Sequence, residues 1–133
     1  MSVHPPPVTT LPLLHTRTLE PGLGRLVVVV SGEVDMATAP ALRSELLSAI
    51  TARAPLAIEV DLAGCTFLDC SGLGVLVAAR ARALATSCEL RITRPRPFVR
   101  VLLDKAGLLD LFTAPENPTA PAPALRHASA LAA

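Results

Sequence analysis

The chain has 133 residues, enough for one domain, and 51% of them are hydrophobic, which supplies ample material for a core. Only 2% are aromatic, which argues against stacking of single-stranded nucleic acid or sugars on the protein surface. The net charge of +1 gives no electrostatic basis for binding nucleic acid or an anionic membrane.

Composition divides the chain into three parts. Residues 1–10 are rich in proline and are expected to form a flexible tail. Alanine and proline dominate after Thr113, so residues 115–133 are expected to be mostly disordered. A single folded domain is therefore predicted over residues 11–114. No run approaches the roughly 20 apolar residues of a membrane span, and the first residues do not resemble a signal peptide.

The first half of the domain predicts two strands and a helix. The run Arg25–Ser31 is β-branched without alternation, which is typical of a central strand covered on both faces. Thr38 is placed to cap a helix that has Pro40 in its first turn. In chain order the predicted elements are an edge strand, a turn, the central strand, a loop and the helix, at residues 11–20, 21–24, 25–31, 32–37 and 38–53.

The second half alternates strands with helices. Its predicted elements are a strand, a helix, an alternating strand, a helix and a short closing segment, at residues 56–61, 72–86, 88–93, 98–105 and 108–112. The expected apolar stripe of the first of these helices consists of Leu73, Leu76, Val77 and Leu84. Gly107 is expected to end the last helix as a C-terminal cap. This order predicts an α/β or α+β domain in which a mixed sheet carries the helices.

The segment Asp69-Cys70-Ser71-Gly72-Leu73-Gly74 leads into a helix and is the most informative part of the chain. Ser71 is expected in the first helical turn, with its hydroxyl facing outward. Such a serine can cap the helix, or it can accept a phosphoryl group, because a helix N-terminus favours an anion. The two glycines suggest that the backbone passes close to the sheet beneath it or to a partner above it.

Two aspartates are expected near this serine. Asp35 and Asp69 each follow a strand, so both carboxylates are predicted at one edge of the sheet. Paired carboxylates serve in acid–base catalysis or in metal binding. The three histidines, however, lie near the termini and are expected to be exposed, at His4, His15 and His127.

Known catalytic motifs do not surround Ser71. Position 69 is Asp and position 73 is Leu, so the Gly-x-Ser-x-Gly elbow of serine hydrolases is missing. The chain also lacks a phosphate-binding loop and the third glycine of a dinucleotide fingerprint. The sequence therefore predicts a protein that is not an enzyme, with no catalytic residues, no cofactor and no metal site.

The cysteines and the clustered arginines each allow two interpretations. The odd set Cys65, Cys70 and Cys88 has no C-x-x-C pair, which indicates reduced cysteines used as small apolar fillers in a cytoplasmic protein. Cys70 at a helix start is also compatible with a redox-sensing thiol. The arginines cluster in one place, as either a solvated rim or a partner surface, at Arg94, Arg96 and Arg100.

Three segments resemble the bacterial anti-sigma-factor antagonists, namely Ser31–Asp35 with Thr38-Ala39 and Leu42-Arg43, Asp61-Leu62 with Thr66–Leu76, and Phe98–Leu102 with Ala106–Leu108. The resemblance implies a STAS domain, with a mixed sheet of about four to five strands and helices packed mainly on one face. Two departures stand out. Cys70 replaces the Ser or Thr that is frequent in the family, and the usual C-terminal helix is hard to find, with Leu125–Ala132 as a detached substitute.

The resemblance also implies a working cycle called partner switching. The unmodified domain binds an anti-sigma factor that is a serine kinase, which frees a sigma factor. Phosphorylation then weakens binding, and a serine phosphatase resets the cycle. Ser71 matches the phosphorylated serine, and the implied partner-binding residues are Asp35, Thr38, Asp69, Cys70, Ser71, Gly72 and Leu73.

A rival hypothesis shares this fold. A STAS domain outside sigma control would act as a scaffold or as a regulatory module for another kinase-regulated partner. A gene for a serine kinase or an anti-sigma factor nearby in the genome would favour the first hypothesis over this one.

Overall fold

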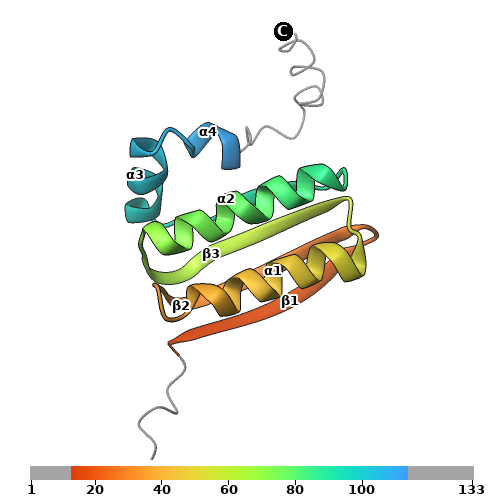
Figure 1. Ribbon diagram of the computed structural model, residues 1–133, viewed down its shortest axis with the longest axis horizontal. Helices are drawn as coiled ribbons and strands as arrows, with labels where there is room; N and C mark the ends of the chain where they lie inside the picture. Colours follow the sequence, from red (N-terminus) through yellow and green to blue (C-terminus); the bar gives the residue numbers. More distant parts are fainter. Residues whose placement is uncertain (1–12, 114–133) are drawn as a thin grey trace, which may run out of the picture.

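The computed structural model of the chain describes residues 13–113, which form a mixed sheet with helices (Figure 1). The strands are β1 (Leu14–Gly22), β2 (Arg25–Val34), β3 (Ala57–Leu68) and β4 (Glu89–Thr93). The helices are α1 (Ala39–Arg53), α2 (Cys70–Ala85), α3 (Pro97–Lys105) and α4 (Leu109–Phe112). The predicted mixed α and β class is confirmed. The predicted tails, the domain limits at residues 11 and 114, and the substitute helix at 125–132 lie outside the described residues.

The sheet has the strand order β1-β2-β3-β4. β1 pairs antiparallel with β2, whereas β2 with β3 and β3 with β4 pair in parallel. Parallel neighbours need a crossover connection, and α1 and α2 supply the two crossovers. Figure 1 shows α1 and α2 on the same face of the sheet. Within residues 13–113, the other face carries no helix, and we call it the open face.

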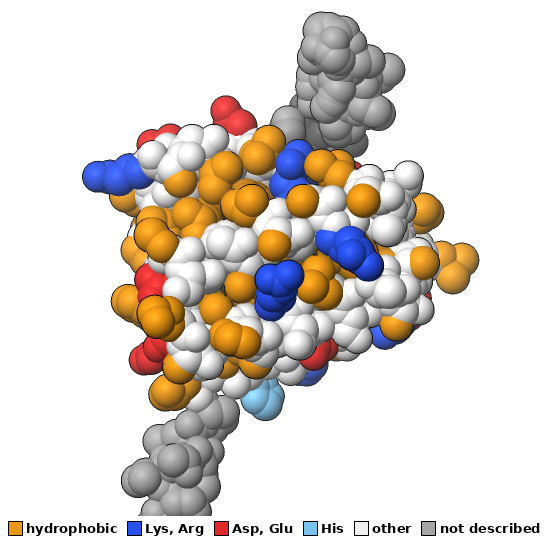
Figure 2. Space-filling model, in the orientation of Figure 1, with side chains coloured by type: hydrophobic (Ala, Val, Ile, Leu, Met, Phe, Trp, Pro, Cys, Tyr) orange, Lys and Arg blue, Asp and Glu red, His pale blue; other side chains and the backbone are white. Residues whose placement is uncertain are grey.

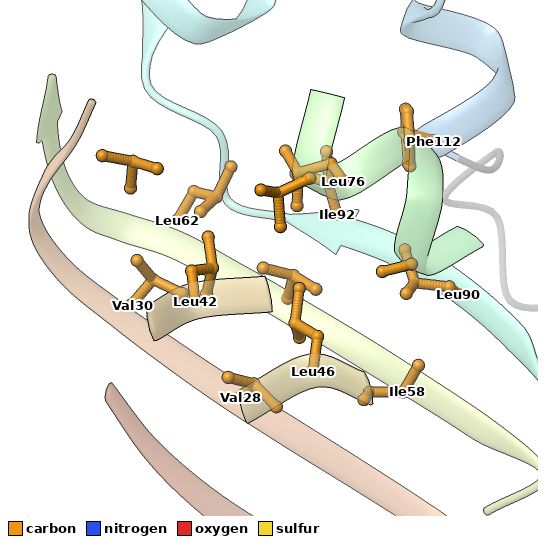
Figure 3. Packing of buried hydrophobic residues seen from close by; sticks show 14 of the residues in the cluster. Val28, Val30, Leu42, Leu46, Ile58, Leu62, Leu76, Leu90, Ile92 and Phe112 are labelled. Atoms are coloured by element: carbon orange, nitrogen blue, oxygen red, sulfur yellow. The ribbon is translucent and has the colours of Figure 1, made fainter. Parts of the chain in front are cut away.

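The core lies between the sheet and the two crossover helices. Alternate residues of β2 point into it and are fully buried, as Val28 and Val30 show (Figure 3). Leucines of α1, an isoleucine of β3 and Leu76 of α2 meet them there. Phe112 of α4 is fully buried as well. Aliphatic side chains thus build nearly all of this interior, as the composition predicts.

β2 differs from its prediction in two ways. Val27 and Val29 lie on the open face and are only half-buried, so the strand is covered on one face and not on both. Valines on both sides hide the alternation in the sequence. The strand also continues to Val34, so the predicted loop starts later. Gly32 has a positive φ there, and a Cβ would collide with the carbonyl oxygen of Leu13.

The apolar stripe predicted for α2 is partly wrong. Leu76 is buried, but Val77 and Leu84 are exposed. The residues that face the core are Gly72, Val75, Leu76, Ala79 and Ala83. Small residues dominate this set, and they allow the helix to pack close to the sheet. Larger apolar residues such as Val77 and Leu84 lie on the outer side of α2.

The remaining elements follow the sequence with shifted ends. β3 runs on to Leu68, past the short β4, with two irregularities in its register against β2. Gly107 has the expected left-handed conformation after α3, and the amide of Leu108 donates to the Leu103 carbonyl oxygen at 2.8 Å. In the described range, no helix is both long enough and apolar enough to cross a membrane.

Candidate functional site

The segment around Ser71 lies where β2 and β3 end side by side. Val34 and Leu68, the last residues of the two strands, are register partners. Asp35 and Asp69 follow them directly, and the Asp69 amide donates to the Val34 carbonyl oxygen at 3.3 Å. The structure therefore brings both aspartates to one edge of the sheet, as the sequence predicts.

Asp69, and not Ser71, is the N-cap residue of α2. Its carboxylate oxygen Oδ1 accepts hydrogen bonds from the amides of Ser71 at 2.9 Å and Gly72 at 3.3 Å. The capping interpretation of Ser71 is therefore wrong. Asp and Ser are equally good capping residues, and the helix starts at Cys70, which gives the role to Asp69.

Ser71 is left with a free side chain. It occupies the second position of α2, is half-buried, and its hydroxyl makes no hydrogen bond with any residue between 13 and 113. The Asp69 carboxylate already occupies two amides of the first turn.

Asp35 and Thr38 hold the neighbouring turn together. The Asp35 carboxylate accepts from the amides of Ala37 at 2.9 Å and Thr38 at 3.1 Å. The Thr38 hydroxyl donates to the Glu33 carbonyl oxygen at 2.7 Å and accepts from the Asp35 amide at 3.0 Å. Thr38 is the N-cap residue of α1 as predicted, but its hydroxyl bonds back to the strand end instead of to the helix amides. The turn is fixed on both sides as a result.

The two glycines of the segment have different surroundings. A Cβ on Gly72 would lie 2.7 Å from Cγ1 of Val34 and 3.1 Å from Cγ of Leu68, so α2 packs against the strand ends at this point. A Cβ on Gly74 would meet nothing within 4 Å. Gly72 thus fits the sheet beneath it, whereas Gly74 lies on the outer surface. Of the predicted partner-binding residues, Gly72 is buried and the others are half-buried or exposed.

Exposed apolar side chains surround the edge. Figure 2 shows hydrophobic side chains gathered on the left of the helix-covered face, where α2 begins. Cys70 is exposed, so the filler interpretation holds only for the buried Cys65 and Cys88, and burial raises the pKa of both of those thiols. Met36, in the turn after β2, is 78% exposed and was not predicted. Its only sequence signal is an unbranched apolar residue inside a loop.

An ion pair stabilises the part of β3 that lies beyond the end of β4. Arg94 donates to both carboxylate oxygens of Asp61, at 3.2 and 2.6 Å, and Asp61 is buried. Burial alone raises the pKa of Asp61, but the hydrogen bonds from Arg94 and from the Ala63 amide outweigh it and leave that pKa below its usual value. Arg96 donates to the Ala63 carbonyl oxygen at 3.3 Å. Part of the predicted arginine cluster therefore fastens the chain between β4 and α3 to β3.

Groups for catalysis or metal binding do not assemble in the described part. His15 is exposed on β1, while the other two histidines lie outside the described residues. Across residues 13–113, no three side chains of His, Cys, Asp or Glu lie close enough to hold a metal ion together. The chemistry available at the edge is that of a free hydroxyl beside a carboxylate-capped helix.

Comparison with known proteins identifies the fold family. Residues 21–113 match a family model described as "Mlab, STAS domain". The chain belongs to the STAS domain family. This STAS domain is 32% identical over 94 residues to an anti-sigma F factor antagonist of Paenibacillus polymyxa, a match that covers 71% of the chain and 80% of the relative. The resemblance to the anti-sigma-factor antagonists is thereby confirmed.

Solved structures agree. An anti-sigma factor antagonist from Mycobacterium paratuberculosis superposes with a TM-score of 0.62 at 33% identity, over 76% of this STAS domain and 83% of that chain. The unphosphorylated anti-sigma factor antagonist SpoIIAA superposes with a TM-score of 0.66 at 19% identity, over 87% and 97%. At that identity the second likeness shows the fold alone. The predicted STAS fold, with helices mainly on one face, is confirmed.

Proposed function

We propose that this STAS domain is an anti-sigma-factor antagonist that is switched by phosphorylation of Ser71. In its unmodified form it binds an anti-sigma factor with serine-kinase activity, so that a sigma factor is released. It acts as a binding module and not as an enzyme. The relatives that match over most of the chain bear the name of this activity.

The single observation that carries the proposal is the free hydroxyl of Ser71. Asp69 fixes the backbone of Ser71 at the start of α2, and the hydroxyl has no partner within residues 13–113. A kinase needs a hydroxyl that is held at a defined place yet available for transfer. Modification there leaves the Asp69 cap and the packing of Gly72 against Val34 intact.

The switch then depends on charge and not on unfolding. Phosphorylation adds about −1.5 to −2 charges at neutral pH. These charges appear beside Asp69 and close to Asp35, in a surface that the partner must cover. Like charges placed together in an interface cost several kcal/mol of binding free energy. A loss of this size is enough to abolish detectable binding of the partner. A serine phosphatase restores the neutral surface.

The other predicted contacts surround this hydroxyl. Cys70 and Leu73 flank it on α2, with exposed and half-buried side chains. Asp35 and Thr38 present the adjacent turn. Gly72 supports the contact from beneath, because it sets how closely α2 approaches the strand ends.

A titration against a serine-kinase anti-sigma factor from the source genome tests the proposal. Wild-type protein, Ser71→Ala, Ser71→Glu and the phosphorylated protein are compared, with circular dichroism to verify that each is folded. We expect Ser71→Ala to bind like unmodified wild type, and the glutamate variant and the phosphoprotein to bind far more weakly. Equal affinity of all four folded proteins would refute the proposal.

A further inference from the structure

Three of the four arginines on α1 and α2 have no carboxylate partner among residues 13–113, whereas Arg53 at the end of α1 pairs with Glu20. Arg43 of α1 and Arg80 and Arg82 of α2 form no ion pair with any residue between 13 and 113. Figure 2 shows basic side chains near the middle of this face with few acidic ones around them. These three guanidinium groups are therefore not neutralised by a carboxylate within residues 13–113, although the whole chain is close to neutral.

Helix geometry places these arginines on the sides of α1 and α2 and not on their outermost surfaces. The Thr18 hydroxyl of β1 donates to Glu45 at 3.1 Å, so Glu45 faces β1. Arg43 lies two residues earlier, about 200° around the helix, and therefore points to the opposite flank, beside which α2 packs. Arg80 and Arg82 are also about 200° apart, so they project from opposite flanks of α2.

Between these two flanks α2 presents an uncharged strip. Cys70, Gly74 and Val77 are all exposed, and they follow one another along the outer side of the helix. Ser71 lies at one end of this strip. The face thus combines an uncharged centre, arginines on its borders and the phosphorylatable hydroxyl at its end.

We propose that this face docks an acidic protein surface, with carboxylates opposite Arg43, Arg80 and Arg82 and small or apolar groups opposite the strip. This inference rests on the proposed function, since it describes the surface that the anti-sigma factor offers. Desolvated guanidinium groups need carboxylates or comparable acceptors, which favours an acidic partner over a neutral one.

Arg82 does not form an ion pair with a phosphate on Ser71 within the same molecule. Ser71 and Arg82 share a flank of α2, but eleven residues separate them, which is about 16 Å along the helix axis. Arg82 is therefore too distant to pair with a phosphate on Ser71.

Charge reversal tests the proposal, with the serine-kinase anti-sigma factor as the probe. The variants are Arg43→Glu and Arg82→Glu, and the matched control is Arg17→Glu. Arg17 also lacks an ion-pair partner among the described residues, but its register places it on the open face. We expect each helix-face variant to weaken binding by about tenfold at low salt, mainly through slower association. The control should stay within about twofold, and added salt should weaken wild-type binding.

The outcomes separate the two proposals. If wild type fails to bind, or Ser71→Glu binds as tightly as wild type, the proposed function fails and this inference falls with it. If Ser71→Glu weakens binding while Arg43→Glu and Arg82→Glu bind like wild type, only the acidic-partner inference is overturned. A loss of affinity in Arg17→Glu equal to that in Arg82→Glu would also overturn it. Circular dichroism of each variant excludes misfolding as the cause.

Discussion

Two of the three arginines on the open face of the sheet are ion-paired within residues 13–113, whereas only Arg53 of the four arginines on α1 and α2 is. Arg25 pairs with Glu59, Arg91 with Glu89, and Arg94 with the buried Asp61. The arginines of α1 and α2 without such partners in the described range are Arg43, Arg80 and Arg82.

This difference indicates that the charges on the two faces serve different purposes. Charges on the open face and at its edge are used within the domain, where they hold strands and connections together. Arg43, Arg80 and Arg82 on the helix-covered face are left for contacts with other molecules, on the same face as the free hydroxyl of Ser71. Removal of an ion-paired charge on the open face should therefore lower stability and leave binding unchanged, whereas replacement of an unpaired arginine on α1 or α2 should alter binding and leave stability unchanged.

Asp61→Asn gives the largest expected effect on stability. The variant loses charge-assisted hydrogen bonds from Arg94 at a buried site, and bonds of this kind contribute about 1.5–3 kcal/mol. Urea unfolding measures the loss, and Glu59→Gln is the control because its ion pair with Arg25 is exposed and contributes about 0–1 kcal/mol. Partner binding should be unchanged in both variants. A large loss of affinity in Asp61→Asn would contradict the claim that this ion pair acts only within the domain.

The same pair predicts a dependence on pH. Because the pKa of Asp61 is lower in the folded protein than in the unfolded chain, the wild type gains stability from it only when the carboxylate is ionised. The stability gap between wild type and Asp61→Asn should be complete above the unfolded pKa of about 3.9. It should shrink as the pH falls from there through the lower folded pKa. A gap that stays constant across this acid range would contradict the ion pair.

Gly72→Ala and Gly74→Ala sharpen the contrast within α2 itself. The first forces a methyl group to 2.7 Å from Val34 and should destabilise the domain by about 1–3 kcal/mol. The second meets open space and should stabilise the helix by about 0.5–1 kcal/mol. Thermal unfolding of both variants measures this. Equal destabilisation would mean that the outer side of α2 is packed within the domain after all.

Asp69→Ala and Ser71→Ala separate the cap from the switch. Removing the Asp69 carboxylate takes away the acceptor for two amides and should cost about 1 kcal/mol. Ser71→Ala should change the free energy of unfolding by less than about 0.5 kcal/mol, since its hydroxyl has no partner in the described range. If Ser71→Ala proved the more destabilising change in urea titrations, the assignment of the N-cap would be wrong.

Local sequence signals predicted where the residues of the candidate site lie in the fold. Asp35 and Asp69 each follow a strand, and a Ser-Gly step opens a helix, so the sequence places them at one edge. The choice between Asp69 and Ser71 as N-cap was not predictable, because both residue types cap helices and only the exact start of α2 decides between them.

Long-range features were harder to predict. Arg94 and Asp61 are 33 residues apart, and no local pattern links them. The open face of β2 was missed because Val27 and Val29 are as apolar as the buried valines between them. The inner face of α2 was missed because glycine and alanine, rather than larger residues, pack against the sheet.

Nuclear magnetic resonance mapping of the complex tests the central claim most directly. Isotope-labelled STAS domain is titrated with the serine-kinase anti-sigma factor, and the backbone amide shifts are followed in the unmodified and the phosphorylated protein. We predict that the largest changes fall in the turn at residues 35–38 and in the first two turns of α2, and that they vanish after phosphorylation of Ser71. Changes confined to the open face, around Arg17 and Val29, or changes unaffected by phosphorylation, would contradict the account.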